Sequence, residues 1–378
     1  MSFVDQEAAI ARLFSSQPVP EDWFSANMRE QDMPAAIARA IGRLRRQYGT
    51  VEGIRREPDH YLVTLERAEA PVHIALDPHG RIAGLLLQPA TPTTGSLGSF
   101  VEAIAALPGQ TACLIATDGL VRHGHNTDLP LAVGSAMKLA VLQAVALAVS
   151  EGRLQWEQVC ALRDEDRSLP SGILQDWPSG ARLTVESLAA LMISISDNTA
   201  TDFLLRLAGR AAVEAIAPSC KPFLTTREAC ILKAAAHAGL RSQWLEGNTD
   251  ARRALLVTLA GLDLPSMQDM TPGNAPEIEW FLTAAELHRY LCATRDLPTF
   301  RINSGPVDAR HWRRIAFKGG SEANVLNLSV ALGAKDGREH CVVVTWNSSE
   351  EINPERLMTP FLGIVHALRG REARVELN

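Results

Sequence analysis

The stretch LAVGSAMKLAVLQAVALAVSE, residues 131–151, places one lysine in an otherwise apolar segment, and this feature restricts the fold most strongly. Gly134 and Ser135 interrupt the entry to this segment, and apolar residues then recur at helical spacing, at Leu139, Leu142, Val145, Ala146 and Val149. The pattern predicts that Ser135 opens a buried helix. A buried lysine must find polar partners or lose its charge. Lowering its pKa from about 10.4 to near 7 corresponds to about 4 to 5 kcal/mol of differential solvation, so the rest of the chain has to bring polar groups to Lys138.

Ser135 and Lys138 form a Ser-x-x-Lys pair, and residues three apart lie on the same face of a helix. The hydroxyl and the amine can therefore meet, and the amine can take the proton when the serine attacks a carbonyl. A serine at a helix start can also cap exposed backbone N–H groups while the lysine reaches solvent. The apolar neighbours of Lys138 favour the first interpretation.

Two more polar motifs follow along the chain. Ser196-Asp197-Asn198 lies between two apolar helical runs, 61 residues after Ser135, and Lys318-Gly319-Gly320 lies in an alternating stretch typical of an edge strand. Ser-x-x-Lys, Ser-Asp-Asn and Lys-Thr-Gly are the three motifs of class A β-lactamases and penicillin-binding proteins. The chain resembles this superfamily over residues 100–378, with Lys-Gly-Gly as its third motif.

The resemblance implies a role for each residue of the first two motifs. Ser135 is expected to be the nucleophile and Lys138 its general base. Ser196 is expected to relay the proton, and Asn198 to offer its amide to the substrate or to Lys138. Asp197 is expected only to cap the following helix, since Ser, Asp and Asn are favoured at helix starts.

The third motif is expected to bind the substrate. Lys318 adds positive charge for a substrate carboxylate, although an edge-strand lysine can also simply guard against aggregation. Gly319 and Gly320 let the strand approach the substrate closely. The backbone N–H groups of Ser135 and Ser321 are expected to form the oxyanion hole, in which one donor is typically worth about 3 to 4 kcal/mol to the transition state.

A base for deacylation is harder to find in the sequence. Class A enzymes use a glutamate that follows the Ser-Asp-Asn motif and holds a water, and the nearest candidate here is Glu228, 32 residues after Ser196. Thr225-x-x-Glu228 before an apolar run is also a helix capping box, and we favour this interpretation. Loss of a placed general base typically costs a factor of about 100 to 10,000, so an acyl-enzyme is expected to hydrolyse slowly.

The chain is long enough for two domains. Helical patterns precede alternating segments in the first part, which predicts a small α+β domain over residues 1–88. PATPTTGSLGS, residues 89–99, is typical of a linker, and residues 100–378 form the predicted second domain. The expected first-domain helices span 5–14 and 34–48, its strands 50–57, 60–67, 72–76 and 81–87, and its turns 58–59, 70–71 and 78–80.

Strand patterns lie at both ends of the second domain, with helices between and a closing helix at 354–369. They predict one antiparallel sheet built from both ends, with helices on both faces, which is also the fold of the serine β-lactamase superfamily. The stretches PFLTTREACILK and FKGGSEANVLNLS are similar to two-domain β-lactamase-like proteins that accompany clavulanic acid biosynthesis. That resemblance implies an NTF2-type, steroid-isomerase or cystatin-like first domain. The second-domain strands are expected at 111–117, 120–125, 313–320, 324–333 and 338–346.

Composition excludes several other classes of function. The net charge of −6 does not favour nucleic acid or an anionic membrane, and no apolar run reaches the length of a membrane-spanning helix. Asp5 and Glu7 stand where a signal peptide would need basic residues, so we expect a cytoplasmic protein. The six cysteines show no Cys-x-x-Cys pairing, and we expect no disulfides. The string from His123 to Asp128 is a better match to a hairpin turn than to a metal site, and no cofactor is expected.

The sequence therefore predicts a serine hydrolase that forms an acyl-enzyme with a β-lactam or a related ester or amide. The alternative is a non-hydrolytic acyl-binding or scaffold protein that keeps the pocket without turnover. The expected partner is a small-molecule substrate, and association into a homo-oligomer stays open.

Overall fold

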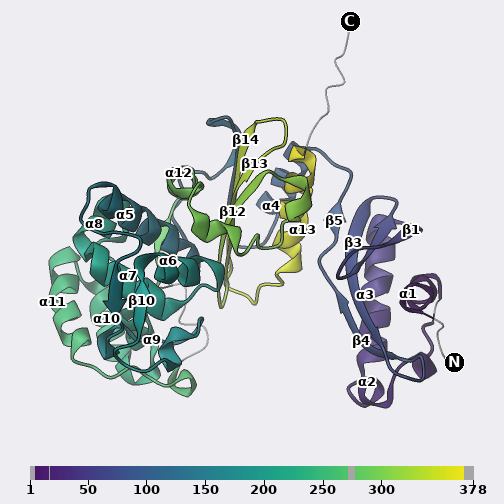
Figure 1. Ribbon diagram of the computed structural model, residues 1–378, viewed down its shortest axis with the longest axis horizontal. Helices are drawn as coiled ribbons and strands as arrows, with labels where there is room; N and C mark the ends of the chain where they lie inside the picture. Colours follow the sequence, from purple (N-terminus) through teal and green to yellow (C-terminus); the bar gives the residue numbers. More distant parts are fainter. Residues whose placement is uncertain (1–4, 17, 271–276, 370–378) are drawn as a thin grey trace, which may run out of the picture. The chain divides into compact units, whose positions relative to one another are not determined.

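The computed structural model describes residues 5–16, 18–270 and 277–369, which divide into two compact units. The first contains the described residues up to Phe100 together with the helix α13 (Glu355–Leu368), and the second runs from Val101 to Pro354 (Figure 1). The predicted division assigned this closing helix to the second domain. It groups with the first unit because it packs on β5 (Thr91–Pro92), and a Cβ at Gly363 would lie 2.5 Å from the Phe100 ring.

The first unit has the predicted order of helices followed by an antiparallel sheet. The strand order is β1-β2-β3-β4, and β5 also pairs with β3. Its core is made by apolar side chains of α1, α3 and the sheet, with Ile10 and Val63 fully buried. The likeness to steroid isomerases or cystatins stays a prediction. The elements are α1 (Gln6–Ser15), α2 (Ala26–Glu30), α3 (Met33–Tyr48), β1 (Val51–Arg56), β2 (Tyr61–Leu65), β3 (Ala68–Leu76) and β4 (Ile82–Leu87).

One predicted turn and the predicted linker differ from the structure. Ala70 and Pro71 lie inside β3, and the reversal before it falls at Glu66 and Arg67. On one side, β3 pairs with β5 up to Glu69 and with β4 from Val72 onward. Pro71 lies between these two pairings and, among the described residues, faces no partner strand on that side, so a proline is tolerated there. Residues 89–99, the predicted linker, contain the strand β5, which pairs with β3.

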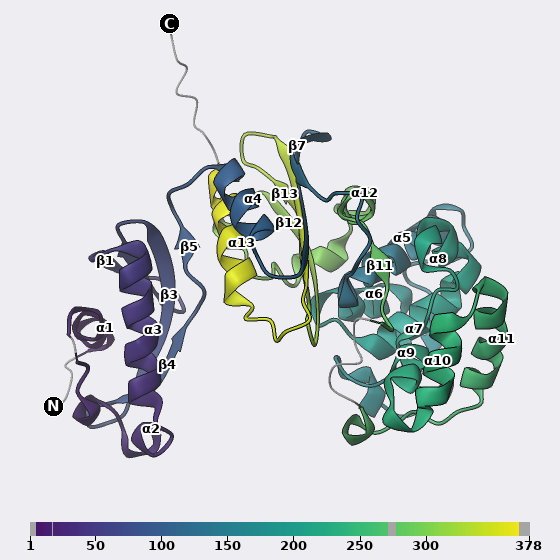
Figure 2. The same ribbon diagram turned by 180° about the vertical axis from the view of Figure 1, so that it is seen from behind.

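The second unit combines a five-stranded antiparallel sheet with a group of helices, which lie side by side in both views (Figures 1 and 2). The sheet order β12-β13-β14-β6-β7 joins strands from the two ends of the unit, as the strand patterns predicted. α12 (Ala284–Thr294) packs on β6, β13 and β14 and also on α5 (Lys138–Ser150). The strands are β6 (Gln110–Thr117), β7 (Leu120–His125), β12 (Arg314–Glu322), β13 (Val325–Gly333) and β14 (Glu339–Asn347).

The region between β7 and β12 is mainly helical. The short strands β8 and β11 pair with each other near the two ends of this region, and β9 pairs with β10 within it. The remaining elements are α4 (Leu97–Ala105), β8 (Leu131–Ala132), β9 (Val159–Ala161), β10 (Arg182–Thr184), α6 (Val185–Ser194), α7 (Asn198–Ala208), α8 (Arg210–Ile216), α9 (Thr226–Lys233), α10 (Ala238–Glu246), α11 (Thr249–Ala260) and β11 (Phe281–Leu282).

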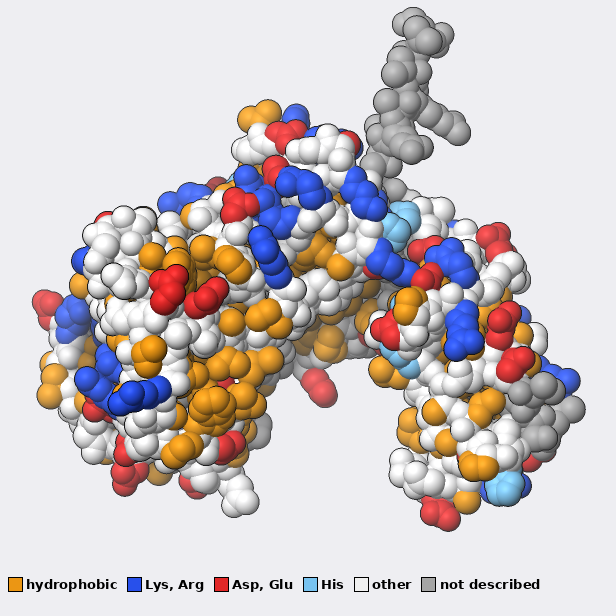
Figure 3. Space-filling model, viewed as in Figure 1, with side chains coloured by type: hydrophobic (Ala, Val, Ile, Leu, Met, Phe, Trp, Pro, Cys, Tyr) orange, Lys and Arg blue, Asp and Glu red, His pale blue; other side chains and the backbone are white. Residues whose placement is uncertain are grey.

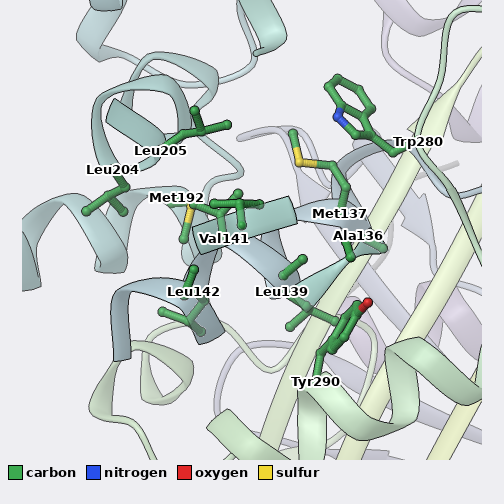
Figure 4. Close-up of a cluster of buried hydrophobic side chains, with 14 of the residues drawn as sticks. Ala136, Met137, Leu139, Val141, Leu142, Met192, Leu204, Leu205, Trp280 and Tyr290 are labelled. Carbon is green, nitrogen blue, oxygen red and sulfur yellow. The ribbon is translucent and has the colours of Figure 1, made fainter. Parts of the chain in front are cut away.

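The helix α5 lies at the centre of the core of the second unit. Leu139 and Leu142 are fully buried, as is Lys138 at its start. Figure 4 shows apolar side chains of α5 among Met192, Leu204, Leu205, Trp280 and Tyr290. A helix that is apolar on all sides is stable only when buried, and each fully buried large side chain contributes about 1.5 to 3 kcal/mol. This burial fixes the position of the residues at the start of α5.

The observed architecture confirms the predicted fold class, a mixed α and β chain with antiparallel sheets. The expected strand at 120–125 is β7, and the turn before it, at Asp118 and Gly119, has both residues at positive φ. His123 and His125 lie in this strand and not in a turn, and residues 126–128 form the turn that follows. Within the described ranges, the helices all fall short of the length and apolarity that a membrane crossing requires.

Candidate active site

Ser135 lies in a 3₁₀ turn, Gly134–Met137, that leads directly into α5. The sequence predicted a helix start at Ser135, but the regular helix begins only at Lys138, and no side-chain cap is formed at either start. The tighter turn follows from Gly134, whose φ of +51° is in the left-handed region. The Ser135 hydroxyl is thus not used as a cap and faces Lys138.

Lys138 is completely buried, and its amine is surrounded by the polar groups that the sequence required. Nζ lies 3.1 Å from Ser135 Oγ and 3.0 Å from Ser196 Oγ. It lies 2.5 Å from the backbone oxygen of Ser196 and 2.6 Å from Asn198 Oδ1. Three of the predicted residues therefore converge on one nitrogen, and Ser135, Ser196 and Asn198 stay partly exposed.

Burial lowers the pKa of Lys138 well below its ordinary value, and the nearby charge of Lys318 lowers it further. Carboxylates at Asp202 and Asp197 act in the opposite direction but do not outweigh burial. Taking a full charge out of water is far more expensive than burying a neutral amine. Burial therefore favours the neutral amine, which is the form that can accept a proton.

The turn that carries Ser196 is held by Asp197. Asp197 caps α7, accepting from the N–H of Ala200 at 2.8 Å, which confirms its predicted role. Its other oxygen accepts from Ile173 and Leu174, and a Cβ at Gly172 would lie 2.3 Å from it. Ser196 itself has a φ of +59°. These contacts hold Ser196 in a conformation that non-glycine residues rarely adopt.

Lys318 approaches Ser196 from the sheet. Its side chain is buried, and Nζ lies 3.0 Å from Ser196 Oγ and 2.6 Å from the backbone oxygen of Gly319. Burial lowers the pKa of Lys318 to about 7. The Ser196 hydroxyl thus lies between two amines, Lys138 and Lys318, as a proton relay requires.

The edge strand β12 passes very close to the turn of Ser135. A Cβ on Gly320 would lie 2.0 Å from the Val133 carbonyl oxygen and 2.8 Å from the Ser135 nitrogen, so no larger residue fits. A Cβ on Gly134 would lie 3.2 Å from the nitrogen of Ser321. The two backbone nitrogens proposed as oxyanion donors therefore belong to neighbouring segments. Gly319 is less restricted, with its nearest contacts at 3.2 and 3.3 Å.

Glu228 is engaged in two structural interactions. It closes a capping box with Thr225 at the start of α9, which confirms the favoured interpretation of this motif. Its carboxylate also pairs with Arg210, with nitrogen–oxygen distances of 2.7 and 3.0 Å. In the described part of the chain it has no hydrogen bond to Ser135, Lys138 or Ser196, so its contacts give no support to a role as deacylation base.

A second charged cluster beside the site was not predicted. Lys233 Nζ lies 2.6 Å from Glu279 and 3.7 Å from Glu322, and the backbone of Gly134 lies against the Glu279 carboxylate. Glu322 lies on β12, two residues after Gly320 and four residues after Lys318. Because side chains alternate along a strand, these three residues lie on the same side of β12. The one signal in the sequence is Lys233 in an apolar helical run; its partners are distant along the chain.

Asp202 was also missed, although it lies one turn after Asn198. It is buried and accepts from the N–H groups of Thr226 at 2.7 Å and Arg227 at 2.8 Å. Burial raises its pKa to about 7. This carboxylate joins α7 to the start of α9 beneath the site.

Known proteins share parts of this arrangement. A family model described as the β-lactamase enzyme family matches residues 103–249, which contain Ser135, Lys138, Ser196 and Asn198. The β-lactamase VEB-1 of Pseudomonas aeruginosa is 34% identical over 87 residues, which make up 22% of this chain and only 29% of that relative. The crystal structure of a β-lactamase from Sphaerobacter thermophilus matches with a TM-score of 0.50 at 23% identity, covering 72% of this chain and 95% of that one. The fold is therefore β-lactamase-like.

Proposed function

We propose, on the basis of this fold and this site, that the protein is a serine hydrolase that forms an acyl-enzyme with a β-lactam or a related ester or amide. The convergence of Ser135, Ser196 and Asn198 on the buried amine of Lys138 is the observation that carries the proposal. The closer kinship with two-domain proteins of clavulanic acid clusters is part of the proposal, and the α+β first unit is compatible with it.

The contacts of Lys138 indicate how Ser135 is activated. A neutral amine has two N–H donors and one lone pair. The two shortest contacts, to the Ser196 carbonyl at 2.5 Å and to Asn198 Oδ1 at 2.6 Å, involve groups that only accept. They occupy both N–H groups, which leaves the lone pair for a hydroxyl. The Ser135 O–H, 3.1 Å away, then donates to the amine and loses its proton to it as Oγ attacks the carbonyl carbon.

The leaving nitrogen or oxygen needs a proton when its bond to the carbonyl carbon breaks. Ser196 Oγ lies 3.0 Å from both Lys138 and Lys318, so it can pass a proton from an amine to the leaving group. The N–H groups of Ser135 and Ser321 stabilise the oxyanion, and Lys318 attracts a substrate carboxylate. Proton transfer of this kind typically contributes about 100- to 10,000-fold to the rate.

Deacylation separates hydrolase action from the alternative, an acyl-binding protein without turnover. Glu228 is engaged with Thr225 and Arg210, and this observation favours a long-lived acyl-enzyme. Such a protein would react once with its ligand and release it slowly. The two functions share the acylation step and differ only in the lifetime of the adduct.

Time-resolved intact mass spectrometry tests the proposal. A penicillin, a cephalosporin and an acetyl ester are added separately to the full chain, to Ser135→Ala and to Ser150→Ala, a matched exposed serine at the other end of α5. A ring-opened penicillin adds its whole mass, whereas the ester adds only its acetyl group because the alcohol leaves.

We expect adducts on the full chain and on Ser150→Ala and none on Ser135→Ala. Decay of the adduct with release of product supports hydrolysis, and a stable adduct supports the acyl-binding alternative. An adduct that persists in Ser135→Ala contradicts the assignment of the nucleophile. The absence of both adduct and product with all three reagents contradicts the substrate class proposed here.

A further inference from the structure

A cavity of about 530 Å³ lies at the start of β12, between this strand and the segment that follows α12. Four arginines line it, Arg295, Arg301, Arg313 and Arg314, together with Trp312 and Phe300. Arg314 precedes Lys318 by four residues on the strand, which corresponds to about 13 Å. The cavity is therefore distinct from the candidate active site.

The cavity has more positive than negative charge. A single carboxylate, Glu339, is shared by three of the arginines: Arg313 at 2.6 Å, Arg295 at 3.7 Å, and Arg314. Among the residues that the structure describes, Asp296 pairs only with Arg314. Arg301 is exposed, and no ion pair involving it occurs among the described residues. Two carboxylates thus face four guanidinium groups, and two positive charges are left over.

Buried donors around the cavity lack acceptors. Trp312 is only 6% exposed, and within residues 5–16, 18–270 and 277–369 its Nε1 has no hydrogen-bond partner. The same holds, across the described chain, for the Nε atoms of Arg295 and Arg314. A buried donor without an acceptor typically costs about 1 to 3 kcal/mol, so such groups are rare.

We propose that this cavity binds a small polyanion through its phosphate or carboxylate groups. Guanidinium groups bind both kinds of oxyanion in pairs of parallel hydrogen bonds, and the excess of positive charge around this cavity favours an anion. The volume lies in the range of small-molecule sites, about 300 to 1,000 Å³. Figure 3 shows Lys and Arg side chains gathered over the part of the second unit that contains α12 and the edge of the sheet. The proposal does not depend on the function of the active site.

Isothermal titration calorimetry tests the proposal on the full chain, with pyrophosphate as the phosphate probe and citrate as the carboxylate probe, at constant ionic strength. The variants are Arg301→Gln and Arg313→Gln, both at exposed positions. Arg122→Gln is the matched control, because it removes the same charge from β7 at the opposite edge of the same sheet. Lys318→Ala reports on binding in the active site instead.

We expect one binding site. Its affinity for the probe should fall roughly tenfold in Arg301→Gln or Arg313→Gln and stay unchanged in Arg122→Gln. Added salt should also lower this affinity. Tighter binding of pyrophosphate identifies a phosphate ligand, and tighter binding of citrate identifies a polycarboxylate. The proposal is overturned if neither probe binds at millimolar concentration, if the arginine variants bind as the parent does, or if only Lys318→Ala abolishes binding.

Discussion

Replacing Gly320 by alanine should separate the Ser135 and Ser321 N–H groups, the two proposed donors of the oxyanion hole. The added Cβ would lie 2.0 Å from the carbonyl oxygen of Val133, and ordinary contact begins at about 3.4 Å. Both partners are backbone segments, so no side chain can rotate away, and β12 has to move by about 1.4 Å from the turn of Ser135. That shift carries the Ser321 N–H away from the oxyanion. Loss of one such donor typically costs about 2.7 to 4 kcal/mol, a factor of about 100 to 1,000 in the rate.

The assay is the acylation rate with a chromogenic cephalosporin, with thermal unfolding measured in parallel. Gly319→Ala is the matched control on the same strand, because its Cβ meets only contacts of 3.2 Å or longer. It should slow acylation far less than Gly320→Ala. The reasoning is refuted if Gly320→Ala acylates at the rate of the parent, or if Gly319→Ala is equally slow at the same thermal stability.

Three further predictions use the buried charges. The kcat/KM for acylation should rise with pH as Lys138 loses its proton, and it should fall as Lys318 loses its own proton near pH 7. Lys318→Arg should move the falling limb of this profile to higher pH, because arginine keeps its proton. An unchanged kcat/KM profile in this variant would contradict the prediction. Because burial raises the pKa of Asp202 to about 7, the folded state keeps a proton that the unfolded chain releases near pH 4. The unfolding free energy should therefore fall between about pH 4 and pH 7, and Asp202→Asn should flatten this slope in urea titrations. Lys233→Met should cost about 3 to 5 kcal/mol by leaving Glu279 buried and unpaired, and adding Glu279→Leu should restore most of it; equal losses in the single and double variants would argue against the ion pair.

Local patterns in the sequence were enough to place the elements that carry the site. Lys138 stands out because its neighbours are apolar, and the structure shows it fully buried. The cap by Asp197 and the capping box of Glu228 both involve residues three apart, which a helix brings together whatever surrounds it. These two local predictions were therefore confirmed, whereas the helix start expected at Ser135 lies three residues later, at Lys138.

Predictions that depend on distant partners were less complete. Pro71 was assigned to a turn because nothing near it in the sequence shows that β3 changes partner there. Lys233 and Glu279 are 46 residues apart, and the arginine cavity depends on Glu339 from another strand. Apart from Lys233 in its apolar helical run, neither cluster has a sequence pattern of its own.

By itself, the sequence determined that Ser135 and the Ser196-Asp197-Asn198 motif lie at or just before helix starts and that Lys318 lies on a strand, because helical and strand periodicity depend only on local backbone geometry. Only the tertiary structure decided their chemistry. The acceptors of Lys138 come from 58 and 60 residues away, and Lys318 reaches Ser196 across 122 residues. The protonation state of an amine depends on its burial and on the charges within a few ångströms of it, and folding alone sets both.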